Sequence, residues 1–291
     1  MRVRREKRLG YFSEYTRGFN RSSRGPAYHA MLRMIDSYFD DSADDRMERH
    51  CATGGFFGRA VQWDAFIIAW SQETHGLKKP FHTTDCEGGY EQFEGWPKEK
   101  RNELMAGLVS IIKGSKLAGF ASIVPIQAYK AAFPNCESGD PYLLTIPHTI
   151  MNMASIADNA DIGVNIWFEL GGPKGFIGET FEAIKKMKWK PAQRLHALAF
   201  DTKELHPLQS ADLLAREAFK HIDNIGVRPM RIPMKRMGDS NFFIAWTEDA
   251  LRYLAANGGP QNLELLAHWD EYPDAPKLKW HSLWLAKRGG K

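Results

Sequence analysis

The sequence contains few cysteines and no long apolar run. Its three cysteines, Cys51, Cys86 and Cys136, are far apart along the chain. They form neither a Cys-x-x-Cys metal half-site nor an even-numbered disulfide framework, so we expect a protein of the reducing cytoplasm. The richest apolar stretches, such as residues 65–70, fall well short of the roughly 18 residues that span a bilayer, and no membrane association is expected.

The motifs of several large enzyme classes are also missing. The glycine-rich stretch 171–178 matches neither GxGxxG nor GxxxxGK[ST], so it predicts a turn after a strand and no nucleotide cradle. The chain has no GxSxG elbow, and its cysteines show no activating pattern. Serine and cysteine hydrolase chemistry therefore has no support in the sequence.

Charge of both signs is present, but it is unevenly distributed. Residues 1–33 hold nine Lys or Arg against two Glu, a net charge of +7, and five cations follow residue 275 without an acid. Because the whole chain carries +4, the middle carries −8. Basic ends on an acidic middle fit a polyanion held around a carboxylate-lined site, or they are simply solvated ends. The N-terminal residues lack the apolar segment of a secretory signal, although their arginines would also suit a mitochondrial transit peptide.

Two internal clusters add further cations. The first consists of Lys185, Lys186, Lys188, Lys190 and Arg194, with Trp189 among them, and the second of Arg228, Arg231, Lys235 and Arg236. Cations beside an aromatic side chain suit phosphates and exposed bases, and they equally suit an exposed helix end. We predict that the first cluster contacts nucleic acid.

Hydrophobic periodicity predicts an α/β fold. Apolar runs predict strands at 34–40, 51–58, 117–126, 161–170 and 195–200, and helical spacing predicts helices at 61–75, 98–113, 147–157, 176–187 and 208–222. This order indicates a mixed sheet of about five strands with helices on both faces. We expect a basic arm over 1–33, one domain over 34–225, and a C-terminal extension over 226–291 that packs on the same domain.

Acidic residues stand where predicted strands end. Asp40 and Asp41 follow the first strand, Glu169 the fourth and Asp201 the fifth, while Asp212 lies in the apolar start of the last helix. Carboxylates that converge on one sheet edge repel one another unless a divalent cation lies between them, and hard oxygen ligands favour Mg²⁺ or Mn²⁺. For each acid the alternative is a helix cap or a solvated strand end. Asp201 is the weakest candidate, since it could simply open the following turn.

Four short motifs in the middle of the chain form a recognisable series. In chain order they are Phe39-Asp40-Asp41-Ser42-Ala43-Asp44, Gly54-Gly55-Phe56, Phe81-His82-Thr83-Thr84-Asp85 and Gln209-Ser210-Ala211-Asp212-Leu213-Leu214, with Trp70 in the helix after the second. Together they resemble the domain-of-unknown-function 3800 family over about residues 34–221. The resemblance implies a ribonuclease-H-like fold, whose members place acids on the first strand, a later strand and the final helix.

The resemblance also implies roles for individual residues. Asp40 would be the central metal-bridging carboxylate and Asp212 the ligand on the late helix. Glu169 occupies the strand-end position where the superfamily often has a ligand. Asp41 stands where the family usually has Glu, and Ala43 where it usually has Gly, so the part that Asp41 plays stays open.

His82 and Asp85 lie in a polar segment that we expect to be irregular. A histidine three residues from an aspartate could orient a water, bind metal or shuttle protons, or it could donate to a backbone carbonyl in a structural loop. Gln209 could bond near Asp212, contact nucleic acid or simply start its helix.

Two functions follow from these observations. The first is a Mg²⁺- or Mn²⁺-dependent nuclease-like phosphodiesterase in which Asp40, Glu169 and Asp212 hold metal and Asp41, His82 and Asp85 support them. The second is a non-catalytic module that retains the fold and binds nucleic acid or protein. Carboxylates more than about 10 Å apart could not share a metal pair and would favour the second. A lysine or arginine filling the pocket would likewise count against the enzyme.

Overall fold

The computed structural model describes residues 34–44, 46–134, 140–171, 174–237 and 240–282. The chain divides into two units, residues 1–34 and 35–291. The predicted basic arm over 1–33 lies outside the described residues, as do Cys136 and the end of the basic tail from residue 283.

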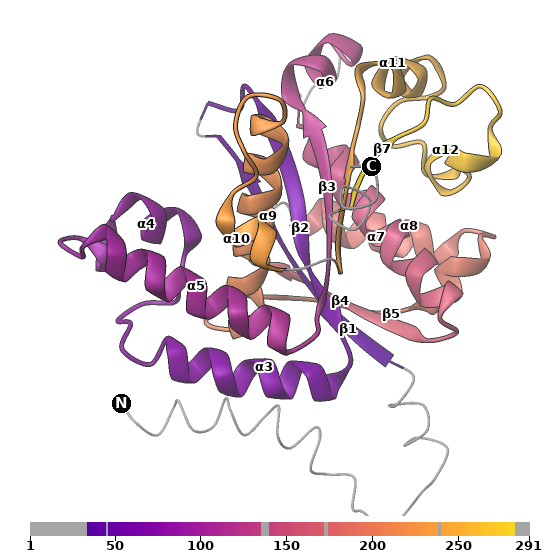
Figure 1. Ribbon diagram of the computed structural model, residues 1–291. Helices are drawn as coiled ribbons and strands as arrows, with labels where there is room; N and C mark the ends of the chain where they lie inside the picture. The colour runs from indigo at the N-terminus through magenta and orange to yellow at the C-terminus, as the bar shows by residue number, and fades with distance from the viewer. Residues whose placement is uncertain (1–33, 45, 135–139, 172–173, 238–239, 283–291) are drawn as a thin grey trace, which may run out of the picture. The chain divides into compact units, whose positions relative to one another are not determined.

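A seven-stranded mixed sheet forms the centre of the second unit (Figure 1). In chain order the strands are β1 (Met34–Ala43), β2 (His50–Gly58), β3 (Ala118–Pro125), β4 (Gly163–Glu169), β5 (Leu195–Asp201), β6 (Asn241–Ala245) and β7 (Lys279–Ser282). Their order across the sheet is β5-β4-β1-β2-β3-β6-β7. Pairing is antiparallel from β1 to β2, β2 to β3 and β6 to β7, and parallel from β4 to β5 and β3 to β6. The α/β prediction is confirmed, and all five predicted strands are present.

Helices cover both faces of this sheet, and each face has its own apolar core. On one face lie α3 (Ala60–Glu73), α4 (Thr83–Gly88), α5 (Lys98–Gly114), α9 (His206–Asn224) and α10 (Ile232–Met237). On the other lie α6 (Ile126–Ala132), α7 (Tyr142–Asn159), α8 (Lys174–Lys186), α11 (Glu248–Ala256) and α12 (Leu263–Ala267). Neighbouring strand residues face opposite sides, so Tyr38 joins the first core and Phe39 the second. None of the described helices is long and apolar enough to cross a membrane.

Several elements differ from the sequence expectation, among them α6, α10 and α12, which it did not include. The helix predicted to start at Pro147 begins five residues earlier, at Tyr142, because buried residues such as Leu144 and Ile146 continue its packing face despite the internal proline. The segment expected to be irregular contains α4 and a short 3-10 helix, Glu91–Phe93. The C-terminal extension contributes β6 and β7 to the same sheet.

A glycine in β2 sets the position of α9. A Cβ atom on Gly54 would lie 2.9 Å from the Cα of Ala215 and 3.2 Å from the Cβ of Ala121. Any side chain at residue 54 would therefore push α9 off the sheet. The close contact brings Asp212, one turn before Ala215 on α9, to the end of β1, where Asp40 pairs in register with Gly54.

Candidate functional site

The end of β1 presents two adjacent acids to opposite faces of the sheet. Asp40 is 5% exposed and faces the side covered by α9. Asp41 faces α7, where the Tyr142 hydroxyl donates to its Oδ2 at 2.5 Å. The Asp41 backbone N–H donates to Asp40 Oδ1 at 2.8 Å, which fixes the Asp40 carboxylate.

Asp212 meets Asp40 from α9 and is held by α4. Its Oδ2 accepts the backbone N–H of Thr83 at 2.7 Å. His82 Nε2 lies 3.4 Å from Asp212 Oδ1, and His82 Nδ1 lies 3.0 Å from Asp85 Oδ2. His82 thus lies between Asp85 and Asp212, and the segment that contains His82 and Thr83 contacts Asp212 on α9.

A lysine lies between the two central acids. Lys203 comes from the turn between β5 and α9, and its Nζ is 2.9 Å from Asp40 Oδ2 and 3.1 Å from Asp212 Oδ1. Gln209 holds this turn, since its Nε2 donates to the Lys203 carbonyl at 2.6 Å while its Oε1 accepts from Trp70 Nε1 at 2.8 Å. A cation therefore occupies the place between Asp40 and Asp212.

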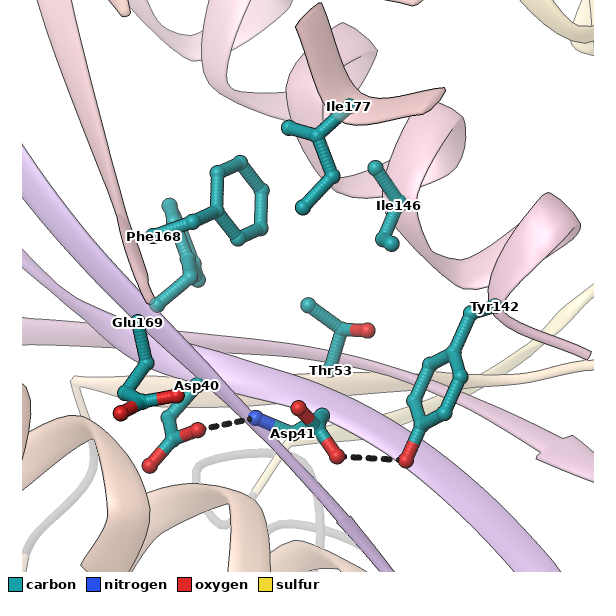
Figure 2. A pocket seen from close by; sticks show the side chains of 9 residues that line it. Asp40, Asp41, Thr53, Tyr142, Ile146, Phe168, Glu169 and Ile177 are labelled. Atoms are coloured by element: carbon teal, nitrogen blue, oxygen red, sulfur yellow. Dashed lines mark hydrogen bonds between the residues drawn. The ribbon is translucent and has the colours of Figure 1, made fainter. Parts of the chain in front are cut away.

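Glu169 at the end of β4 completes the cluster (Figure 2). Glu169, Asp40 and Asp41 line one cavity of about 20 Å³, whose other walls include Phe168 and Ile177. This volume holds about one water molecule. Figure 2 shows the carboxylates of Glu169 and Asp40 turned away from these apolar walls and Asp41 turned towards Tyr142.

Burial sets the protonation behaviour of the cluster. Desolvation raises the pKa of Asp40 against the lowering effect of Lys203, and the nearby Asp212 and Asp41 raise it further. Burial opposes the charge of Lys203, but Asp212 and Asp40 together outweigh it and raise the pKa of the ammonium group. Desolvation also raises the pKa of Asp41, with the Tyr142 hydrogen bond opposing it. The burial effect is therefore the larger one, and the pKa of Asp40 is raised to about 8 even with Lys203 beside it.

The donor atoms fit a hard divalent cation in their chemistry, but not in their present arrangement. Three carboxylates from β1, β4 and α9 supply oxygen ligands of the kind that Mg²⁺ prefers. In the described part of the chain, however, no group of three or more His, Cys, Asp or Glu side chains is placed to hold a metal ion. Lys203 supplies the positive charge instead, and a lysine in this place counts against an enzyme.

The residues proposed as catalytic lie in two sets that share Asp40. Asp40, Asp41 and Glu169 line the cavity, whereas Asp40 and Asp212 meet at Lys203 and His82 links Asp212 to Asp85. Asp201 pairs with Glu169 in register, and its Oδ1 accepts the backbone N–H of Thr202 at 2.8 Å, so it opens the turn, as its alternative interpretation held.

The first cationic cluster lies away from this site. Lys190 and Arg194 belong to the 3-10 helix before β5, at the end of that strand opposite Asp201. Seven strand residues separate the two ends by roughly 20 Å. Both cations pair with Asp158, and Arg194 also pairs with Asp161. The predicted nucleic-acid contact therefore lies far from the acids.

Two residues of the site were missed in the sequence. Lys203 stands in a polar Asp-Thr-Lys-Glu turn, and a cation two residues after a strand-end acid was the available signal. Tyr142 gave no signal, because its contact with Asp41 depends on α7 extending beyond Pro147.

Comparison with known proteins does not assign the chain. No family model and no curated protein matches it. Membership of the family that the motifs resemble stays a prediction, and the chemistry of the site has to be argued from its own geometry.

Proposed function

We propose that this chain is a divalent-metal-dependent, nuclease-like phosphodiesterase that acts on nucleic acid at the cluster around Asp40. The observation that supports the proposal is that two buried carboxylates from distant parts of the sequence, Asp40 and Asp212, meet at the end of β1. Acids on the first strand, a later strand and a late helix are also the pattern implied by the resemblance to the domain-of-unknown-function 3800 family and the ribonuclease-H-like superfamily.

Asp40, Glu169 and Asp212 would hold Mg²⁺ or Mn²⁺ once Lys203 moves away from the two aspartates. A bound ion would activate water and stabilise the leaving oxygen of a phosphodiester. Lys203 is partly exposed on a long side chain, so in its displaced position it could pair with a phosphate oxygen.

The remaining residues would orient groups and move protons. His82 is held by Asp85 and presents Nε2 to the site, where it could take or deliver a proton. Tyr142 fixes Asp41, and the hydrogen bond from Asp41 N–H fixes Asp40. These contacts would keep the carboxylates in place while the substrate lies over the narrow cavity.

The proposal is tested with labelled single- and double-stranded DNA and RNA in Mg²⁺, Mn²⁺ or EDTA. We expect cleavage that requires the metal, and a loss of about 100-fold or more in Asp40→Asn and in Asp212→Asn, since metal ligation contributes several kcal/mol. Asp64→Asn, at an exposed residue of α3, is the matched control and should cleave normally. Unchanged cleavage in both site variants would disprove the proposal.

The Lys203 bridge favours a second candidate, a non-catalytic module that retains the architecture. An ammonium group already pairs with both Asp40 and Asp212, as a permanent structural ion pair would. The same assays separate the two functions. Salt-sensitive binding of an oligonucleotide with no turnover in either metal would support the module.

A further inference from the structure

Cations follow the acidic cluster along one face of α9. Arg216 and Lys220 stand four and eight residues after Asp212 on this helix, so their side chains point the same way, about 6 Å apart per step. Both pair with Glu87 of α4, and Arg231 joins them there. Three cations thus gather on one partly accessible carboxylate.

The segment after α9 continues this positive charge. Residues 225–237 contain four cations and no acid. Arg228, Lys235 and Arg236 are exposed, and none has an ion-pair partner among the described residues. Arg231 pairs with Glu87 and with the buried Glu217, whereas its Nη1 has no hydrogen-bond partner in the described structure.

A cavity of about 200 Å³ opens within this segment. Its polar walls are His221, Asn224, Arg228 and Arg231, and its remaining walls are Ile225, Gly226, Pro229 and Met230. It is smaller than the roughly 300 Å³ at which sites for whole small-molecule ligands begin. Cationic and apolar walls together suit one sugar-phosphate unit of a longer polymer.

We propose that Arg216, Lys220, Arg228, Arg231, Lys235 and Arg236, named here the α9–α10 basic face, bind the phosphate backbone of a nucleic acid. The inference rests on the proposed function for the class of polymer. Asp212 and Asn224 are twelve residues apart on α9, or about 18 Å, which matches roughly five phosphates of one strand of a B-form duplex at 3.4 Å of helix axis each. A strand on this face would run directly to the acidic cluster.

This position distinguishes the face from the Lys185–Arg194 cluster. The latter lies at the far end of β5, and Asp158 and Asp161 neutralise part of it. The exposed Ile225, Val227 and Ile232 would also suit an anionic membrane. Membrane binding, however, does not explain why the cations continue along α9 towards the acids.

The test measures binding alone, in EDTA, with the full chain and a fluorescein-labelled 20-nucleotide strand of DNA or RNA. The variant Arg228→Gln, Lys235→Gln, Arg236→Gln should raise the Kd at least about tenfold and reduce the slope of log K against log salt by about two to three. The charge-matched control Lys78→Gln, Lys98→Gln, Lys113→Gln, at three exposed lysines outside both cationic clusters, should bind as the parent chain does.

Other outcomes overturn the proposal. Parent-like binding by the first variant, or equal losses in both variants, would reject this face. Loss of binding to phosphatidylserine vesicles with unchanged oligonucleotide binding would assign the face to a membrane. This test measures no turnover, so its outcome is independent of the cleavage assay. If the chain binds the strand through this face but does not cleave it, the enzyme is rejected and the α9–α10 basic face is kept. If the chain cleaves nucleic acid but the first variant binds as the parent chain does, only the face is rejected.

Discussion

Lys203 determines the electrostatics of the candidate site. Its ammonium group contacts Asp40 and Asp212, which are each 5% exposed. Two buried carboxylates this close to one cation would repel each other without it. The lysine is therefore either a permanent structural partner or a charge that a divalent ion can replace.

Lys203→Met distinguishes these roles through stability. Removing one partner of a buried ion pair costs about 3–5 kcal/mol, so the melting temperature at neutral pH should fall by several degrees. Burial raises the pKa of Asp40 to about 8, so the stability difference from the parent chain should be largest above pH 8 and should narrow as the pH falls through that value.

If the acids can bind metal, millimolar Mg²⁺ should raise the melting temperature of Lys203→Met more than that of the parent chain, because no lysine competes. Calorimetry with and without EDTA measures this, and Lys174→Met serves as the control at an exposed lysine. If Mg²⁺ shifts the melting temperatures of Lys203→Met and Lys174→Met equally, removing Lys203 does not free a site for the ion at the cluster.

At the scale of elements, the site depends on how closely α9 lies on β2. Gly54 permits that approach, and both Asp212 and the α9–α10 basic face lie on this helix or directly after it. The position of Asp212 relative to Asp40 thus depends on how α9 packs on β2, and Gly54, which controls this packing, has no functional group of its own.

Gly54→Ala should therefore affect the site from a distance. The new Cβ would meet the backbone of Ala215 at 2.9 Å, and such overpacking costs about 1–3 kcal/mol. We expect a lower melting temperature and weaker activity or metal binding. Gly178→Ala in α8, where a Cβ meets nothing within 4 Å, should be neutral or stabilising by up to about 1 kcal/mol. Parent-like behaviour of Gly54→Ala would show that α9 can shift freely.

At the scale of the whole molecule, the extension after residue 225 is part of the sheet. β6 pairs with β3 over Gly119–Ile123, and Phe242 packs on Phe120. A chain that ends at residue 225, the predicted domain boundary, would leave β3 as an unpaired edge with its apolar partners removed.

We expect that shortened chain to aggregate, whereas a chain ending at residue 282 should stay folded. The soluble fraction and cooperative thermal unfolding measure the difference. A soluble, cooperatively folding chain that ends at residue 225 would restore the boundary expected from the sequence.

Local patterns predicted the first five strands and the residues at their ends, because an apolar run and the polar residue that ends it lie within a few residues of each other in the sequence. β6 has only five residues, and its partner β3 is far away in the sequence, so no local pattern marks it. The position of Lys203 two residues after Asp201 is only a weak local signal, because its role depends on distant residues. Its two aspartates lie on β1 and α9, and only the tertiary fold brings them to the turn after β5.

The adjacent acids of β1 constrain its register from two sides. A slip of one residue along β2 would carry Asp40 to Tyr142 and Asp41 to Lys203, and would exchange Tyr38 and Phe39 between the two cores. A slip of two would restore the facing but move both acids about 7 Å along the strand. The two acids at the end of β1 and the apolar residues in its middle thus together allow only one register of β1 against β2.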